Sequence, residues 1–251
     1  MIKDAHTWGL AAAAGLGLDT SQYDLSSKTG NIHNTGENGW YQGKGTVNAT
    51  PINFAEFFDE LPRAVKNTEA NVTTAKTRVK MNAALAHVRT KFLSCSKAGG
   101  RVIFIGNGGS AAIASHMAVD YSKNGGVRAM AFNDVPTLTC LANDFGYDNV
   151  FAKQLEYYAT KRDVAVIIST SGRSLNIVAA GKLARAMGCY LITFTGMNPN
   201  NTLRAIGDFN FWVPSADYGI VELTHLSLLH AMVDIRLPRE RAAHWKKARS
   251  K

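Results

Sequence analysis

The sequence predicts an α/β protein in which a parallel β-sheet is covered by helices on both faces. From about residue 101 onward, short apolar runs alternate with stretches of helical periodicity. The runs are continuously apolar, which is typical of strands buried on both faces of a parallel sheet. Strands are expected over residues 101–106, 127–132, 163–169, 189–195 and 209–213, and helices over residues 110–123, 136–159, 174–187 and 199–206.

Helices are also expected on both sides of this alternating region. A first helix begins after Asn53, a favourable N-cap residue, because apolar side chains then recur every three or four positions. A second helical stretch covers about residues 74–97 and stops at a pair of glycines, a common C-terminal signal. The last helix covers about residues 217–235 and carries leucines along one face. Two apolar-faced helices that precede a sheet usually pack on the sheet or on a partner subunit.

Composition limits the class of protein. The chain has 251 residues, of which 46% are hydrophobic, and this excludes a chain that is disordered throughout. No run of 18 apolar residues occurs, so no membrane-spanning helix is expected, and Asp4 and His6 argue against a secretory signal. Cys95, Cys140 and Cys189 form neither a metal-binding spacing nor a disulfide framework, which favours a reducing, cytoplasmic location.

The chain is expected to divide into a polar N-terminal extension (1–52), a folded domain (53–236) and a basic C-terminal tail (237–251). The extension holds eight of the 22 glycines and no sustained periodicity. Residues 236–251 carry seven Lys or Arg and one Glu, so the other 235 residues contribute only 21 − 18 = +3 to the net charge of +9. Such a tail is most often a solvated helix end, and less often a contact for an anion, a nucleic acid or a partner. Nucleic-acid binding is therefore not the expected function.

Two expected strands end in loops of small residues that lead into helices. The first loop contains Asn107, Gly108, Gly109 and Ser110. Its glycines permit close approach of a ligand, and the helix start supplies free N–H groups and the positive end of a dipole. The loop matches neither the P-loop nor the dinucleotide fingerprint, and a purely structural turn is the alternative.

The second loop carries more hydroxyl groups than one helix cap requires. These hydroxyls belong to Ser169, Thr170, Ser171 and Ser174. One of them would serve as an ordinary N-cap, whereas four within six residues suit the oxygens of a phosphate ester. The sequence therefore predicts phosphate binding at this loop.

Two helices carry residues that can ligate a metal. His116 and Asp120 lie four residues apart and share a helix face, although such a pair is often only a surface contact. On the last helix, Glu222 and His225 also share a face. His230 lies roughly 80° around the axis from Glu222 and about 12 Å along it. A metal shared by Glu222 and His230 therefore requires long reach from both, or one ligand from an adjacent subunit.

Four segments in this order resemble the sugar isomerase (SIS) domain family, and within it the phosphoheptose isomerase branch: GNGGSAAIASH, LANDFGYDNVF, STSGRSLN and ELTHLSLLH. The similarity runs from about Asn53 to Ile235. It implies an SIS fold with a five-stranded parallel sheet flanked by helices. It also implies N-terminal helices that pack in an oligomer, a homotetramer, and active sites at subunit interfaces.

The resemblance also implies roles for individual residues. His116, Asp120, Glu222 and His230 fall on the positions of the family's zinc ligands, with one Zn²⁺ per subunit. Asp120 would also be the catalytic base, and His230 the partner acid/base. The substrate-binding positions are Asn107, Gly108, Gly109, Ser110, Asn143, Asp144, Ser169, Thr170, Ser171, Ser174 and Glu222. Two positions depart from the family pattern, since Asp120 replaces a glutamate and Glu222 replaces a glutamine, but each keeps a ligating atom.

The reaction that the resemblance implies is a zinc-dependent aldose–ketose isomerisation. Sedoheptulose 7-phosphate would be converted to D-glycero-D-manno-heptose 7-phosphate, or a related heptose 7-phosphate, by proton transfer through an enediol. One alternative is a non-catalytic SIS scaffold that binds a replication-initiator-type protein, and another is a sugar-phosphate sensor. His116 and His230 argue against a pure scaffold, whereas the basic tail and the polar extension favour a partner.

Overall fold

The computed structural model describes residues 54–73, 75 and 77–234. The expected N-terminal extension and basic tail lie outside the described residues, as does Asn53. The described elements follow one another in this order: α2 (Phe54–Asn67), β1 (Glu69–Val72), β2 (Thr77–Val79), α3 (Met81–Lys97), β3 (Val102–Gly106), α4 (Gly108–Lys123), β4 (Ala129–Ala131), α5 (Val135–Phe145), η2 (Tyr147–Asn149), α6 (Val150–Tyr158), β5 (Val164–Ser169), α7 (Leu175–Ala186), β6 (Tyr190–Thr195), α8 (Thr202–Ile206), β7 (Phe209–Trp212) and α9 (Tyr218–Asp234).

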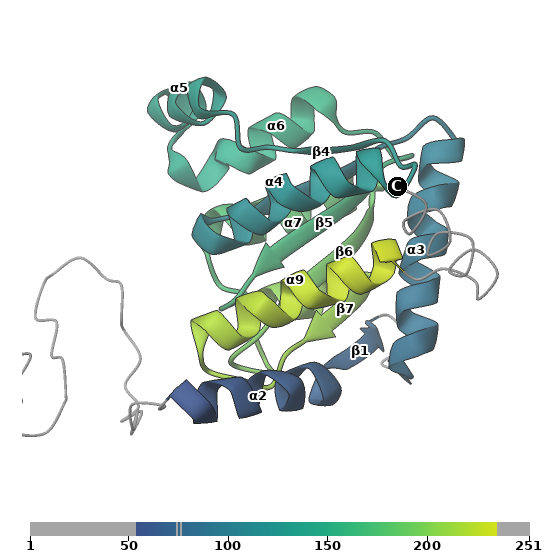
Figure 1. The fold of residues 1–251 in the computed structure, drawn as a ribbon. Helices are drawn as coiled ribbons and strands as arrows, with labels where there is room; N and C mark the ends of the chain where they lie inside the picture. Colours follow the sequence, from purple (N-terminus) through teal and green to yellow (C-terminus); the bar gives the residue numbers. More distant parts are fainter. Residues whose placement is uncertain (1–53, 74, 76, 235–251) are drawn as a thin grey trace, which may run out of the picture. The chain divides into compact units, whose positions relative to one another are not determined.

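The sheet contains the predicted parallel strands and two additional ones. Its order is β2-β1-β7-β6-β5-β3-β4, and the five strands from β7 to β4 are parallel (Figure 1). The predicted fold class is therefore confirmed. β1 pairs antiparallel with β7, and β2 pairs antiparallel with β1. These two strands extend the sheet beyond β7.

The sequence analysis was wrong about the segment before α3. It assigned a helix from about residue 74, but residues 77–79 form β2, and the helix begins at Met81. Thr77 and Val79 are β-branched and favour a strand where a partner is available. β1 supplies that partner, because Ala70 in β1 pairs with both Val79 and Phe211 and is 1% exposed. Likewise, the helix expected over residues 136–159 is divided into α5, η2 and α6.

Each face of the sheet is covered by its own set of helices. Successive residues of a strand point to opposite faces, so Phe104 packs with α3, α4 and α9, whereas Ile103 and Ile105 pack with α5, α6, α7 and α8. Figure 1 shows α4 and α9 in front of the sheet and α7 behind it. Continuous burial of β3 and β5 explains why their sequences are apolar at nearly every position.

The order of strands places the two small-residue loops at one edge of the sheet. β3 and β5 are adjacent and parallel, with Gly106 paired to Ile168, so the loops that follow them emerge side by side. α4 and α9 pack against each other, and α2 packs on α9. None of the helices in the described part of the chain is long and apolar enough to cross a membrane.

Candidate active site

Three potential metal ligands from two helices meet at one point. His116 and Asp120 lie one turn apart on α4, and His230 lies on the neighbouring α9. Nε2 of His116 and Nδ1 of His230 each lie 3.6 Å from Oδ2 of Asp120, and the Nε2 atoms of the two histidines are 3.2 Å apart. The structure thus brings together three of the four residues predicted as zinc ligands.

The geometry of these three residues fits a zinc ion. One ligand atom from each residue lies within 4.8 Å of the others. Tetrahedral zinc, with bonds of about 2.0–2.1 Å to nitrogen or oxygen, places its ligand atoms roughly 3.3 Å apart, and imidazole and carboxylate are among its usual ligands. The side chains of His116 and His230 are 52% and 37% exposed, so the cluster opens to the surface. Oδ1 of Asp120 accepts a 3.4 Å hydrogen bond from Asn124.

Glu222, the fourth predicted ligand, lies outside this group in the described part of one chain. Its carboxylate lies against Gly109 at the start of α4, where a Cβ atom would overlap it. Burial raises the pKa of the Glu222 carboxyl above its ordinary value. Since Glu222 and His230 are about 12 Å apart along α9, a shared metal would need Glu222 from an adjacent copy. The role of Glu222 as a ligand stays a prediction.

The first loop is tied to the second by a pair of amides. Asn107, the N-cap residue of α4, donates a 2.9 Å hydrogen bond to Oδ1 of Asn176 and accepts a 3.1 Å hydrogen bond from its Nδ2. The hydroxyl of Tyr147 also donates to Oδ1 of Asn107, at 3.3 Å. Asn176 is 2% exposed and lies in the first turn of α7. The sequence analysis missed Asn176 and Tyr147, because only the pairing of β3 with β5 brings the two loops together.

The remaining predicted residues of the first loop and of the Asn-Asp pair differ in exposure. Gly108 has a φ of +52°, a conformation that glycine adopts readily, and both Gly108 and Gly109 are exposed. Ser110, by contrast, is 3% exposed. Asn143 and Asp144 are exposed at the end of α5, where the Asn143 amide donates to Asp144 at 2.9 Å.

The second loop is preorganised by its own hydrogen bonds. The Ser169 hydroxyl accepts a 3.1 Å hydrogen bond from the backbone N–H of Gly172, and the Ser171 hydroxyl accepts one of 3.4 Å from the N–H of Arg173. Ser174 is the N-cap residue of α7, yet its side chain makes no capping bond to the described residues. Its hydroxyl and the first N–H groups of α7 are therefore available to an anion. Arg173, which the sequence analysis did not select, is exposed within the same loop.

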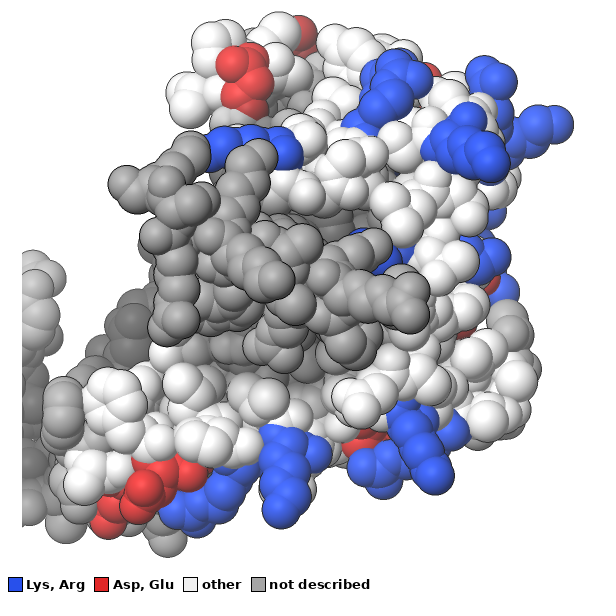
Figure 2. Space-filling view, turned by 45° about the vertical axis from the view of Figure 1, so that its right-hand side comes forward, with Lys and Arg blue, Asp and Glu red and all other residues white. Residues whose placement is uncertain are grey.

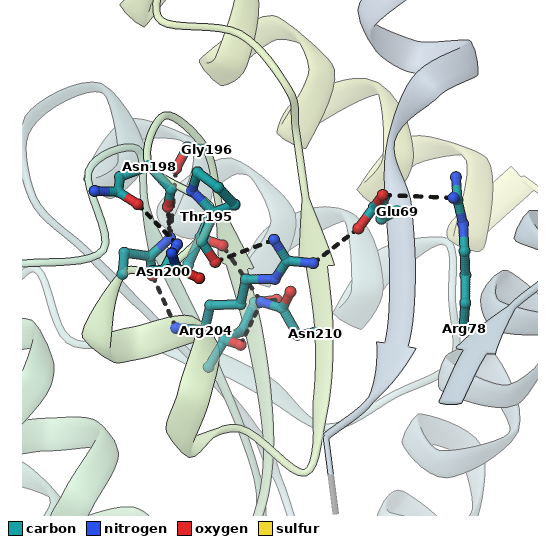
Figure 3. A network of polar contacts seen from close by, with 11 residues as sticks. Glu69, Arg78, Thr195, Gly196, Asn198, Asn200, Arg204 and Asn210 are labelled. Atoms are coloured by element: carbon teal, nitrogen blue, oxygen red, sulfur yellow. Dashed lines mark hydrogen bonds and ion pairs between the residues drawn. The ribbon is translucent and has the colours of Figure 1, made fainter. Parts of the chain in front are cut away.

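The segment after β6 packs against the second loop. Gly172 has a φ of +63°, and a Cβ there would overlap the side chain of Asn201. Asn201 caps α8 by accepting a 2.9 Å hydrogen bond from the N–H of Arg204. Figure 3 shows the Arg204 guanidinium reaching Glu69 of β1, at 2.8 Å, beside the turn that contains Asn198. Through Glu69, β1 thus helps to position the segment that packs against the second loop.

A buried histidine holds the end of β6 in place. His225, on α9, is fully buried, and its Nε2 donates a 3.1 Å hydrogen bond to the carbonyl of Thr195. The next residue, Gly196, donates its N–H to the carbonyl of Thr170 at 2.9 Å. Burial lowers the pKa of His225 to about 4, so the ring is neutral. Although Glu222 and His225 are three residues apart, Glu222 faces the first loop and His225 faces the core.

The sequence of the chain was compared with those of known protein families and proteins. The model of the SIS domain family matches residues 67–196, just over half of the chain. The chain belongs to the SIS domain family. This SIS domain chain is 39% identical over 152 residues to a phosphoheptose isomerase of Geobacter sulfurreducens, an alignment that covers 58% of this chain and 80% of the relative. It is 37% identical over 145 residues to a phosphoheptose isomerase of Helicobacter hepaticus, covering 55% and 74% of the two chains.

Solved structures of SIS proteins have the same fold as this SIS domain chain. The phosphoheptose isomerase of Neisseria gonorrhoeae superposes with a TM-score of 0.61 at 31% identity, covering 72% of this chain and 95% of that one. The phosphoheptose isomerase of Francisella tularensis superposes with a TM-score of 0.62 at 27% identity, covering 72% and 94%. The resemblance inferred from four sequence segments is thereby confirmed.

Proposed function

We propose that this phosphosugar isomerase interconverts sedoheptulose 7-phosphate and a heptose 7-phosphate such as D-glycero-D-manno-heptose 7-phosphate, with one Zn²⁺ per subunit. The observation that carries the proposal is the convergence of His116, Asp120 and His230 within 4.8 Å, in a chain whose relatives are phosphoheptose isomerases. A scaffold or a sensor has no evident need for two imidazoles and a carboxylate arranged in this way. The three free cysteines agree with the predicted cytoplasmic location.

The reaction moves one proton between adjacent carbons of the sugar. A carboxylate takes the proton from C1 of the ketose, an enediol forms, and the proton is returned to C2 to give the aldose. Asp120 is the proposed base. Because its Oδ1 has only a long hydrogen bond to Asn124, that oxygen can accept a proton while Oδ2 faces the two histidines. His230 would carry the hydroxyl proton between O1 and O2. A bound Zn²⁺ would stabilise the negative charge that develops on these oxygens.

The second loop is the proposed phosphate site. The Ser174 hydroxyl, the start of α7 and the hydroxyls of Ser169, Thr170 and Ser171 would surround the phosphate oxygens. Binding energy from this remote group positions the reacting carbons and lowers the barrier of the chemical step. The first loop, with its exposed glycine backbone, and the pair Asn143 and Asp144 would contact the sugar.

A neighbouring copy of the chain would complete the site. His116 and Asp120 lie eight and twelve residues into α4, about 12 and 18 Å along the helix from the first loop. The metal cluster is also exposed, whereas Glu222 lies next to the loop. We therefore propose a homo-oligomer, with four subunits as the resemblance implies, in which ligands and loops from different subunits meet.

An NMR assay with sedoheptulose 7-phosphate tests the proposal. The purified full-length chain should produce an aldoheptose phosphate, and a chelator should abolish this activity until Zn²⁺ is restored. His230→Ala and Asp120→Ala should lose turnover while keeping the circular dichroism of the parent. Conversion that persists after chelation would remove zinc from the mechanism. Binding of the sugar phosphate without conversion would favour the sensor, and neither binding nor conversion would favour the scaffold.

A further inference from the structure

A concave region lies at the edge of the sheet opposite to the two loops. A cavity of about 540 Å³, here called the amino-edge cavity, opens between α3, the turn before β5, the end of α7 and the start of β6. Its walls include residues that directly precede β5, β6 and β7, whereas the two loops follow β3 and β5. Its volume falls within the range of small-molecule sites, about 300–1,000 Å³.

Four cationic residues from separate parts of the fold are among those that line the amino-edge cavity: Lys91, Lys161, Arg162 and Arg185. Within the described residues, none of the four forms an ion pair. Arg185 uses one guanidinium nitrogen to bond the carbonyl of Ile206 at 2.9 Å. The Lys91 ammonium stands 4.6 Å from the centre of the Tyr190 ring. These contacts orient Arg185 and Lys91 without neutralising their charges.

Two carboxylates in the cavity wall do not balance this charge. Asp163 is 3% exposed, and its oxygens accept hydrogen bonds from the N–H of Arg101 at 2.7 Å, the N–H of Thr160 at 2.6 Å and the hydroxyl of Thr160 at 3.1 Å. Asp208 accepts a 2.8 Å hydrogen bond from the N–H of Leu191. Both carboxylates thus hold backbone turns. Four cations and two carboxylates leave a formal charge of 4 − 2 = +2.

Ordinary helix-end electrostatics accounts for one of the four cations. Arg185 lies in the last turn of α7, where a cation balances the helix dipole. Lys91 lies in the middle of α3, and Lys161 and Arg162 lie in the turn between α6 and β5. Figure 2 shows Lys and Arg side chains, in blue, along the upper right-hand margin of the face that it brings forward. An anion bound in the cavity would therefore meet several cationic residues and be attracted by them.

We propose that the amino-edge cavity binds a small molecule that carries a diphosphate group. Arginine forks and lysine ammonium groups are the side chains that bind phosphate oxygens best. A diphosphate has two or three negative charges and matches the local excess of two. The cavity is also larger than a single phosphate requires. This site does not depend on the proposed isomerase function, because it shares no residue with the two loops or the metal cluster.

Inorganic pyrophosphate is the probe for the test. The full chain is titrated with it by calorimetry, and lysine acetylation is measured with and without the probe by mass spectrometry. Pyrophosphate should protect Lys91 and Lys161 from acetylation and leave Lys66, an exposed lysine on α2, unprotected. Arg162→Glu should weaken binding at least tenfold, and Lys66→Glu, the matched control, should leave it within twofold. Circular dichroism melts of both variants exclude misfolding.

Three results would overturn the proposal. The first is equal binding by the parent and Arg162→Glu, or the absence of protection at Lys91 and Lys161. The second is loss of binding in Ser171→Ala/Ser174→Ala or in His116→Ala without loss in Arg162→Glu, which would assign the anion to the candidate active site. The third is binding of orthophosphate as tight as that of pyrophosphate, which would remove the diphosphate specificity.

Discussion

The buried His225 makes the stability of this protein depend on pH. Its Nε2 donates to the Thr195 carbonyl, and Nδ1 has no hydrogen-bond partner among the described residues. Protonation would place a charge in a fully buried site, so burial lowers the pKa of His225 in the folded chain to about 4. In the unfolded chain the pKa returns to about 6.5. The unfolded state therefore binds the proton more tightly between these two values.

The sign and size of the effect follow from linkage. The pKa of His225 is lower in the folded chain than in the unfolded chain. The contribution of neutral His225 to the free energy of unfolding is therefore fully present above pH 6.5 and is lost as the pH falls toward 4. The slope is about 1.4 kcal/mol per pH unit, and a difference of roughly 2.5 pKa units gives about 3 kcal/mol in total. At pH 4.5 most of it, about 2.5 kcal/mol, is already lost.

Urea unfolding of the parent and of His225→Gln, measured in chelator from pH 7 to pH 4.5, tests this reasoning. Glutamine keeps an N–H that can reach the Thr195 carbonyl but does not titrate. The free energy of unfolding of the parent should fall by about 2.5 kcal/mol more than that of the variant over this interval. His87→Gln is the matched control. Burial also lowers the pKa of His87, but this side chain is only half-buried, so its effect should be smaller. Parallel curves for the parent and His225→Gln would refute the argument.

Four further predictions concern the candidate active site. Asn176→Ala should lower the free energy of unfolding by about 1–3 kcal/mol and should lower turnover, because Asn107 loses its buried hydrogen-bond partner. The control is Asn82→Ala, at an exposed position, which should change neither quantity. Urea unfolding and the NMR assay measure the two effects. Gly109→Ala should destabilise the chain because the new Cβ overlaps Glu222, and Glu222→Ala should restore most of that loss; additive effects in the double variant would contradict the contact. Zn²⁺ at 100 times its Kd should raise the free energy of unfolding by about 2.7 kcal/mol in the parent, and His230→Ala should show no such rise in the same denaturation assay. Glu222→Ala and His230→Ala chains can be unfolded, mixed in equal amounts and refolded together. If the two residues act from different subunits, about a quarter of the sites should regain turnover, because such a site has Glu222 from one chain and His230 from the other. No recovery would place both residues in one subunit.

The sequence predicted the strands correctly where the hydrophobic pattern of a segment matches its burial in the folded protein. The runs that became β3 and β5 are apolar at nearly every position because helices cover both faces of a parallel sheet, so the sequence alone indicates that these strands are buried. The prediction was wrong where a strand owes its existence to a partner. β2 has only three residues and pairs with β1, and β1 in turn pairs with β7.

The candidate site also has features that the local sequence predicts and features that depend on tertiary packing. Sequence spacing alone places His116 and Asp120 on one helix face, and the hydroxyl-rich loop is visible as composition. That His230 joins this pair depends on α9 packing beside α4, and the link between Asn107 and Asn176 depends on β3 pairing with β5. Local sequence determines which groups a helix or loop presents, because helical periodicity and turn preferences act over a few residues. Contacts between residues about 70 to 110 positions apart arise only from the packing of the whole sheet and its helices, and these contacts decided which residues could act together.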